Sequence, residues 1–188
     1  MRLFAAVLPP DHVCAELDAV VGELNTLPDA ESLRWTGREG WHITLAFYGD
    51  VADDAVPALS AGLARVAHRT EPFALAVRGG GEFGQGRVVW AGVSGDVAAL
   101  RSLAGRVEDA GREAGVELEP RRYQPHLTLA RGREGVAGEY VAVLDRFAGQ
   151  GWGVGEVVLM CSELPRSGVA GERPRYEVVG RWGLGAGG

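Results

Sequence analysis

Two stretches of the sequence repeat one pattern of side chains that could do chemistry. Residues 42–46 read His-Ile-Thr-Leu-Ala, and residues 126–130 read His-Leu-Thr-Leu-Ala. An imidazole titrates near neutral pH, so in a pair of histidines one ring can be neutral while the other carries a proton. Such a pair can take a proton from an attacking group and give one to a leaving group. We therefore predict that His42 and His126 act together as a general base and a general acid.

A threonine follows each histidine at a distance of two residues. Alternate residues of a strand point to the same side, so Thr44 and Thr128 share a face with their histidines. The same alternation places Ile43, Leu45 and Phe47 of the first copy on the opposite face, toward a core. Threonine hydroxyls can donate hydrogen bonds to phosphoryl oxygens and stabilise charge in a transition state. The two copies therefore predict one site for a phosphodiester.

Other interpretations of these histidines are weaker. One His-x-Thr triplet in a strand is most often structural, but two copies with matching neighbours in a chain of four histidines favour a functional role. His12 and His68 lack this context, and we expect them to be surface or capping residues. A zinc site needs three or four ligands at compact spacing, which neither copy supplies. We predict no metal and no cofactor.

The composition excludes several mechanisms. All 19 basic residues are arginine, so the chain has no P-loop lysine, no Schiff-base lysine and no lysine for the adenylylated intermediate of an ATP-dependent ligase. The Gly-x-Ser-x-Gly elbow of a serine hydrolase does not occur. The formal net charge is −6, so we expect any contact with nucleic acid to be local rather than spread over the surface.

The length and the apolar content of the chain limit the classes of protein to which it can belong. A chain of 188 residues, 46% of them hydrophobic, can form one domain with a sizeable core. Cys14 and Cys161 lie beside apolar residues and are expected to be buried, reduced thiols. The apolar residues 1–10 are too few for a signal peptide, and no run is long enough to span a membrane. We expect a cytoplasmic monomer that does not bind membranes.

Hydrophobic periodicity and turn residues predict an alternation of strands and helices. Strands are expected over residues 2–8, 33–35, 42–48, 72–77, 87–93, 126–130, 154–160 and 176–181, the last two as a hairpin around the loop 163–174. Helices are expected to begin at Asp11, at Asp53 or Asp54 and at Ser94 or Asp96 (ending near Gly115), with a short helix near residues 136–147.

One segment between two expected strands is rich in glycine. Residues 78–86 lack the spacing of a phosphate-binding loop and are predicted to be a mobile loop that presents Phe83. From such a loop Phe83 could stack on a nucleobase, as an alternative to anchoring the loop. Tyr123, just before the second copy, is a similar candidate.

Both halves of the chain thus carry the same His-Thr strand. This indicates an internal duplication with pseudo-two-fold symmetry, which would bring the two strands face to face across a central groove. We expect residues 1–182 to form a single domain and residues 183–188 to be a flexible, glycine-rich tail.

The paired copies resemble the motifs of the 2H phosphoesterase superfamily, and the resemblance extends over nearly the whole chain. It is strongest to the bacterial and archaeal RNA 2′,3′-cyclic phosphodiesterases, also called 2′-5′ RNA ligases. Beyond the two copies, the positions that carry the resemblance are residues 2–5, Arg34, Trp35, Phe47, Gly49, Phe83, Arg87, Trp90, Arg131, Ser162, Leu164 and Tyr176.

The resemblance implies a fold and a reaction. The fold would be α+β and bilobal, with two pseudo-symmetric antiparallel sheets, flanking helices and a central active-site groove. The reaction would be metal-independent hydrolysis of a terminal 2′,3′-cyclic phosphate to a 2′-phosphate, with His126 as base on water and His42 as acid at the 3′ oxygen. The site is nearly symmetric, so these two roles are a hypothesis. Arg131 matches the phosphate-binding arginine of the family, but alternation turns it away from the groove unless a bulge or strand end intervenes.

Three functions remain open at this point. The first is hydrolysis of cyclic-phosphate RNA ends, with weak reversible 2′-5′ ligation that needs no ATP. The second is hydrolysis of a small cyclic nucleotide such as an ADP-ribose cyclic phosphate. The third is binding of RNA ends without catalysis. Rates on RNA and on the small nucleotide separate the first two, and tight binding without product identifies the third.

Overall fold

The computed structural model describes residues 1–136, 138–168 and 172–185 of the chain. In this part of the chain the strands form one antiparallel sheet in the order β7-β4-β5-β6-β3-β1-β8-β9, and β2 pairs with β6. The strands are β1 (Arg2–Val7), β2 (Arg34–Trp35), β3 (Ile43–Asp50), β4 (Phe73–Phe83), β5 (Val88–Gly95), β6 (His126–Arg131), β7 (Trp152–Val154), β8 (Glu156–Glu163) and β9 (Arg175–Gly183). The helices are α1 (Asp11–Leu24), α2 (Val56–His68), α3 (Val97–Glu113) and α4 (Glu139–Asp145), with 3-10 turns η1 (Ala30–Ser32), η2 (Arg38–Gly40) and η3 (Asp53–Ala55).

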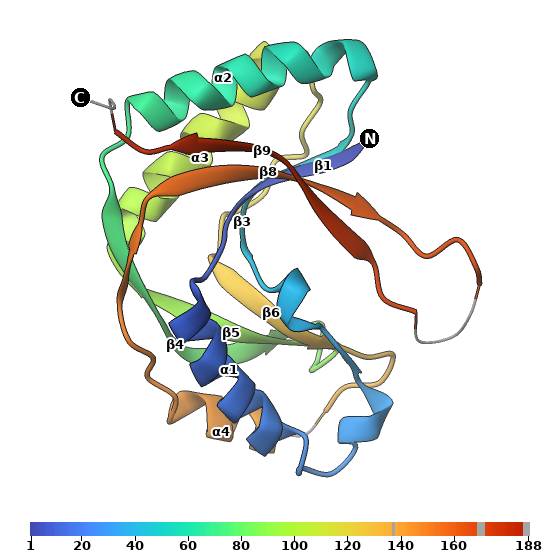
Figure 1. The fold of residues 1–188 in the computed structure, drawn as a ribbon. Coiled ribbons are helices and arrows are strands. Elements are labelled where there is room, and N and C mark those ends of the chain that lie inside the picture. Colours follow the sequence, from blue (N-terminus) through green and yellow to red (C-terminus); the bar gives the residue numbers. More distant parts are fainter. Residues whose placement is uncertain (137, 169–171, 186–188) are drawn as a thin grey trace.

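The sheet curls into two arms that meet at the two motif strands, β3 and β6 (Figure 1). The first arm is β9-β8-β1-β3, with α2 and α3 packed side by side on it. The second arm is β7-β4-β5-β6, with α1 and α4 beside it. One residue pair, Ile43 and Leu127, joins the arms. The predicted α+β class is confirmed, and the two expected sheets are joined into one.

Each arm contains strands from both halves of the chain. β8, from the C-terminal half, pairs with β1 in the first arm, and β4, from the N-terminal half, pairs with β5 in the second. Apart from the short β2 and β7 and the final strand β9, the chain runs twice through strand, helix, motif strand, helix and strand: β1-α1-β3-α2-β4, then β5-α3-β6-α4-β8. The exchange of an outer strand interlocks the halves, and one large apolar core runs through both.

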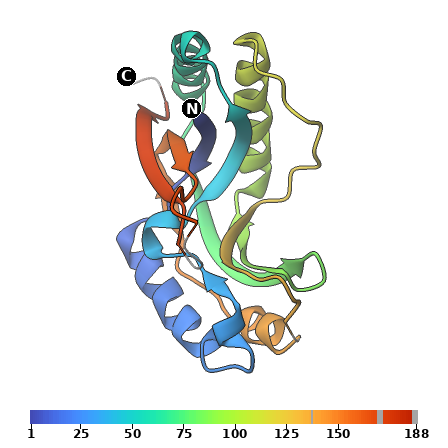
Figure 2. The same ribbon diagram turned by 90° about the vertical axis from the view of Figure 1, so that its right-hand side faces the viewer.

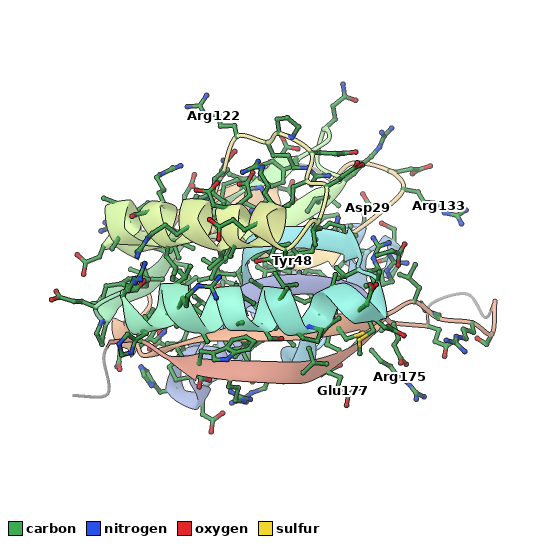
Figure 3. All side chains as sticks on the ribbon, turned by 90° about the horizontal axis from the view of Figure 1, so that it is seen from above. Asp29, Tyr48, Arg122, Arg133, Arg175 and Glu177 are labelled. Carbon is green, nitrogen blue, oxygen red and sulfur yellow. The ribbon has the colours of Figure 1, made fainter. Side chains whose placement is uncertain are left out.

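Helix α3 shows how the sequence pattern produces this packing. Its predicted inward residues recur at helical spacing; Val97, at the start of the helix, is half-buried, and the other four are buried: Leu100, Leu103, Ala104 and Val107. Tyr48 on β3 donates a hydrogen bond of 2.7 Å from its hydroxyl to the carbonyl oxygen of Val107. Seen from above, Tyr48 lies where α2 and α3 cover the sheet (Figure 3). This contact ties the first motif strand to the helix behind it.

The glycine-rich segment is not the predicted mobile loop. β4 continues through it to Phe83, with a register shift between Val77 and Gly80, and a tight turn follows Phe83. A Cβ at Gly80 would lie 2.4 Å from the carbonyl oxygen of Trp90, and one at Gly81 would lie 2.5 Å from the Trp90 ring. The prediction was wrong because these glycines serve the close approach of β4 to β5, not chain flexibility.

The remaining elements differ from the predictions mainly at their ends. α4 covers Glu139–Asp145, shorter than the expected 136–147, and β9 extends to Gly183. The backbone N–H groups of Leu184 and Gly185 donate to the carbonyl oxygens of Gly155 and Ala67, and residues 186–188 of the expected tail lie outside the described residues. Cys14 and Cys161 are buried and free. None of the described helices has the length and apolarity needed to cross a bilayer.

Candidate active site

The two motif strands lie next to each other at the centre of the sheet. Ile43 of β3 is paired with Leu127 of β6 in antiparallel register. One residue further along this register, His42 comes opposite Thr128, and His126 comes opposite Thr44. The structure therefore brings together the four polar residues that were predicted to share a site, with each histidine facing the threonine of the other copy.

The predicted alternation holds for the first four residues of each copy. In both, the histidine and the threonine are half-buried, and the residues between and after them are fully buried: Ile43 and Leu45 in the first copy, Leu127 and Leu129 in the second. Hence the histidine and the threonine of each copy lie on the face of the strand that is turned away from the apolar core.

A β-bulge then interrupts both copies at the same place. Between β1 and β3 the pairing passes from Thr44 to Ala46, and between β5 and β6 it passes from Thr128 to Ala130. The leucine in between is the extra residue each time, so the face to which later side chains point is exchanged. The residue five positions after each histidine thus turns outward.

These residues are Phe47 and Arg131, and both line the groove. The bulge that Arg131 was expected to need is present. The prediction that Phe47 faces the core was wrong: its side chain is 40% exposed, and the guanidinium carbon of Arg2 lies 4.9 Å from its ring centre. Simple alternation failed here because a bulge shifts every later residue by one position.

Both histidine rings are held in the same way. Nδ1 of His42 donates to the carbonyl oxygen of Gly40 at 2.7 Å, and Nδ1 of His126 donates to that of Gln124 at 2.8 Å. A carbonyl oxygen only accepts, so Nδ1 carries the proton, and Nε2 of the neutral ring is left with a lone pair. Each imidazole is thus oriented, with Nε2 available for proton transfer.

Aromatic rings pack against each imidazole from neighbouring strands. His42 lies 4.6 Å from the ring of Phe4 and 5.7 Å from that of Tyr176. His126 lies 5.0 Å from the ring of Phe83 and 6.0 Å from that of Trp90. These apolar surroundings keep water away from both rings on one side.

Burial makes both imidazoles harder to protonate. It lowers the pKa of His42 to about 4, and the charges of His126 and Arg131 act in the same direction, against the hydrogen bond to Gly40. Burial, followed by the charge of Arg131, also lowers the pKa of His126, against the hydrogen bond to Gln124. At neutral pH both rings are therefore neutral when no anion is bound.

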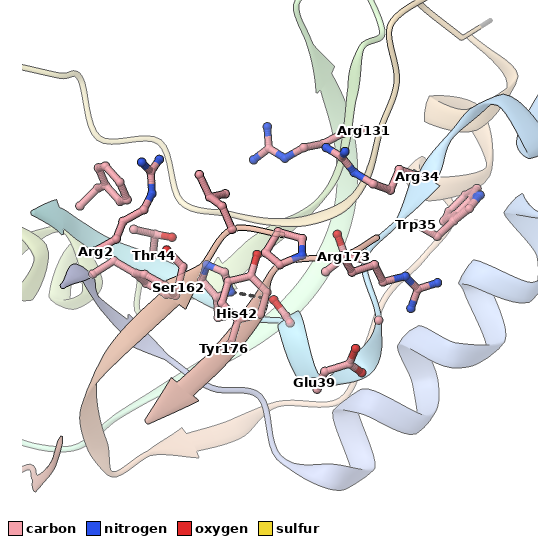
Figure 4. A pocket seen from close by; sticks show the side chains of 17 residues that line it. Arg2, Arg34, Trp35, Glu39, His42, Thr44, Arg131, Ser162, Arg173 and Tyr176 are labelled. Carbon is pink, nitrogen blue, oxygen red and sulfur yellow. Dashed lines mark hydrogen bonds between the residues drawn. The ribbon is translucent and has the colours of Figure 1, made fainter. Parts of the chain in front are cut away.

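On the His42 side the groove forms a cationic hollow with a volume of about 410 Å³ (Figure 4). Its lining includes His42, Thr44, Phe47, Ser162 and Tyr176, with four arginines and one carboxylate: Arg2, Arg34, Arg131, Arg173 and Glu39. In a chain with a net charge of −6, this is a local excess of positive charge, as the composition led us to expect. A hollow of this kind suits a phosphorylated ligand.

On the His126 side lies a second, aromatic hollow of about 550 Å³. It is lined by Phe83, Tyr123 and His126, with Glu108, Glu117 and Glu119 among the other residues. Thr44 and Phe47 line both hollows, so the two adjoin beside the motif strands. Thr128, paired with Trp90 in the sheet, lines neither of these two hollows in the described part of the chain.

Phe83 and Tyr123 make contacts within the protein that the sequence did not suggest. Phe83 stands at the end of β4 and packs edge-on against His126. The hydroxyl of Tyr123 donates a 3.0 Å hydrogen bond to the carbonyl oxygen of Thr44, and the carbonyl oxygen of Tyr123 accepts one from Arg101. The chain from α3 to β6, which carries Tyr123, runs along the side of the molecule (Figure 2). Tyr123 therefore connects this chain to the first motif strand.

Sequence reasoning gave no role to three arginines of the cationic hollow. Arg34 is paired with Arg131 between β2 and β6, Arg2 stacks on Phe47, and Arg173 comes from the connection between β8 and β9. No local motif marks these residues, because strand order alone brings them to one place. Among the described residues, no group of three or more His, Cys, Asp or Glu side chains could hold a metal ion.

Comparisons with known proteins agree with this geometry. The model of the family described as LigT-like phosphoesterase matches residues 7–90 and residues 92–170, so each matched range contains one copy of the motif. A curated relative from Escherichia coli, named RNA 2′,3′-cyclic phosphodiesterase, is 30% identical over 183 residues, which cover 97% of this chain and 96% of that protein. A relative of the same name from Geobacillus stearothermophilus is 34% identical over 155 residues, which cover 80% of this chain and only 47% of that protein.

The fold is also similar to solved structures. The crystal structure of Escherichia coli LigT complexed with 3′-AMP superposes with a TM-score of 0.78 at 27% sequence identity, over 97% of each chain. The structure of TT0787 from Thermus thermophilus superposes with a TM-score of 0.77 at the same identity, over 98% of each chain.

Proposed function

This chain belongs to the LigT-like phosphoesterase family, and we propose that it hydrolyses 2′,3′-cyclic phosphate ends of RNA through acid–base catalysis by His42 and His126. The enzyme class, RNA 2′,3′-cyclic phosphodiesterase, is that of several curated relatives at 30–36% identity. The single observation that carries the mechanism is the matched anchoring of the two imidazoles, each through Nδ1 to the carbonyl oxygen two residues before it.

The reaction needs a base and an acid on opposite sides of the phosphorus atom. In our scheme Nε2 of His126 takes a proton from a water molecule, and the water oxygen forms a bond to phosphorus. The bond from phosphorus to O3′ breaks on the opposite side, and Nε2 of His42 gives its proton to O3′. The product carries a 2′-phosphate and a free 3′-hydroxyl group.

The lowered pKa of His126 suits its role as a base. The lowered pKa of His42 suits the role of an acid only after the substrate has bound. A neutral His126 can accept a proton at neutral pH. His42, with a pKa of about 4 in the free protein, needs the negative charge of the cyclic phosphate nearby to hold a proton. Binding of the anion therefore couples protonation of His42 to the presence of substrate.

Three other groups would stabilise the charge that builds up on the phosphoryl oxygens. Thr44 lines both hollows and Thr128 is half-buried on the neighbouring motif strand, and the hydroxyl groups of both can donate hydrogen bonds. Arg131, turned into the groove by its bulge, can donate two parallel N–H hydrogen bonds to a phosphate. Donors that are already fixed in place need no reorganisation during the reaction. They therefore stabilise the charge that develops in the transition state more strongly than the charge of the bound substrate.

The same site would support weak 2′-5′ ligation. A 5′-hydroxyl group of a second RNA can replace the attacking water, with the same base and the same leaving oxygen. No ATP is consumed, so the absence of lysine is no obstacle. Water is present at far higher concentration, and we therefore expect hydrolysis to dominate.

We propose further that residues 1–182 act as one catalytic unit, as a cytoplasmic monomer. The catalytic groups come from both halves, and the outer strands of the halves are exchanged between the arms. Size-exclusion chromatography with light scattering tests the monomeric state, and the expected mass is that of one chain.

Phosphorus NMR of a nucleoside 2′,3′-cyclic phosphate incubated with the protein and EDTA tests the activity. The expected result is a single new phosphomonoester signal, that of the 2′-phosphate, at an unchanged rate when EDTA is added. Loss of turnover in EDTA would contradict metal-independent catalysis, and a 3′-phosphate product would reverse the assigned leaving oxygen. No turnover on this nucleotide or on a cyclic-phosphate RNA would refute the function.

A further inference from the structure

None of the four arginines of the cationic hollow makes an ion pair within 4.0 Å among the described residues, and only Arg2 has another charge-related contact, with the ring of Phe47. The unpaired guanidinium groups of Arg34 and Arg173, beside the proposed reaction site, are available for an anion from outside the protein.

Both arginines are exposed, and their places in the fold bring them to the hollow. Arg34 lies in β2, in register with Arg131 of β6, and the indole N–H of the next residue, Trp35, donates to the carbonyl oxygen of Ala30 at 3.0 Å. The side chain of Arg173 lies over the turn before η2, since a Cβ at Gly37 would lie 2.7 Å from its Nη1, and the Glu39 carboxylate approaches the same point. Figure 4 shows Arg34, Arg131 and Arg173 on the side of the hollow away from Arg2 and Thr44.

The hollow has room for more than the reacting phosphate. Its volume is about 410 Å³, whereas a group of four oxygens occupies roughly 120 Å³ if each takes the space of a water molecule in liquid water. Neighbouring residues across an antiparallel pair have Cα atoms about 5 Å apart, so Arg34 and Arg131 can each reach a different phosphate. Arginine is well suited to this because its planar group donates two parallel hydrogen bonds to phosphate oxygens.

We propose that Arg34 and Arg173 bind the phosphodiester that links the cyclic-phosphate nucleotide to the nucleotide before it. This inference rests on the proposed function and narrows its substrate: the enzyme selects a chain with a charged linkage next to the reacting end. Arg131 is left for the reacting phosphate. Glu39, the one carboxylate in the lining of this hollow, limits the strength of the attraction.

The test compares two dinucleotides that end in the same 2′,3′-cyclic phosphate. One has a natural phosphodiester linkage, and the other has a methylphosphonate linkage, which has nearly the same shape but no charge. We expect the wild-type enzyme to show a kcat/KM at least about tenfold higher on the charged dinucleotide, since one charge-assisted contact is typically worth about 1.5–3 kcal/mol. In Arg34→Gln and in Arg173→Gln this ratio should fall toward one.

A matched control is Arg69→Gln, which removes an arginine from a different hollow, between α2 and α3. This variant should keep the wild-type ratio, and thermal unfolding should confirm that all three variants are folded. A ratio near one in the wild-type enzyme, or an unchanged ratio in both Arg34→Gln and Arg173→Gln, would overturn the inference while turnover itself left the proposed function intact. Absence of turnover on both dinucleotides would instead refute the proposed function.

Discussion

The two copies of the His-x-Thr motif have nearly the same backbone and different chemical surroundings. Both anchor Nδ1 of the histidine to a carbonyl oxygen two residues earlier, and both contain a bulge at the leucine that follows the threonine. The bulge turns the fifth residue after the histidine outward in both. That residue is Phe47 in the first copy and Arg131 in the second.

At this position the two copies differ in charge, although both side chains line the cationic hollow beside His42. The guanidinium group of Arg2, which belongs to β1, lies over the ring of Phe47. The positive charge beside the first copy therefore comes from a different strand. Arg131 brings its charge from the motif strand itself, and it lowers the pKa of both histidines. The two copies thus share the anchoring of the histidine, and only the second carries a positive charge at the fifth position.

The largest effect is expected where the copies are alike. Replacing either histidine with asparagine should reduce kcat by about 10³-fold, because general acid–base groups contribute 10²–10⁴. His68→Asn, at the end of α2, is the matched control and should keep the wild-type kcat. Steady-state hydrolysis of a nucleoside 2′,3′-cyclic phosphate measures all three variants. A loss in kcat below tenfold for either His42→Asn or His126→Asn would contradict the prediction that both histidines take part in proton transfer.

The next largest effect should show where the copies differ. Arg131→Gln should lower kcat/KM about 10²-fold, as expected when a donor to developing charge is removed. Phe47→Leu, at the equivalent position, should lower it less than about threefold, since only an apolar contact changes. Equal losses in these two variants would show that the fifth position does not distinguish the copies.

Acid stability should report the deeper burial of His42. Folding lowers the pKa of its imidazole from 6.5 to about 4, so between these values the unfolded chain binds the extra proton. The stability present above pH 6.5 is therefore lost as the pH falls toward 4, by on the order of 3 kcal/mol. Urea unfolding of the wild type and of His42→Gln at pH 7 and pH 4 measures this. The variant should lose less stability than the wild type, and an equal loss would contradict the lowered pKa.

The smallest expected effect concerns the link between the copies. Tyr123→Phe removes the hydrogen bond to the carbonyl oxygen of Thr44, and we expect kcat to fall about fivefold with little change in KM, since one such bond is worth about 1 kcal/mol. Tyr140→Phe removes a similar bond, to the carbonyl oxygen of Pro28, and serves as the matched control with unchanged kcat. An unchanged kcat in Tyr123→Phe would contradict the positioning role of this hydrogen bond.

Much of the fold and the centre of the site could be predicted from the sequence. Alternation placed the four His and Thr side chains on one face, and helical spacing gave the inward face of α3, because both signals are local. The bulges were harder to predict. The need for one at Arg131 came from the family resemblance, and without such a guide the same bulge at Phe47 was missed.

Two other differences between the sequence predictions and the structure arise from contacts between distant parts of the chain. A run of glycines predicts flexibility, yet Gly80 and Gly81 allow β4 to pass close to Trp90. The arginines of the cationic hollow come from four separate segments, and only the order of the strands brings them together. Neither relation is visible in a short window of sequence.

The pH dependence of kcat/KM tests the central claim most directly, namely that the two histidines divide the roles of acid and base. Because both pKa values lie below the ordinary value of 6.5 in the free protein, we expect a bell-shaped profile centred below neutral pH. His42→Asn and His126→Asn should each lose one limb of the bell, and not the same one. A profile that is flat from pH 4 to pH 8 in the wild-type enzyme, or loss of the same limb in both variants, would contradict the account.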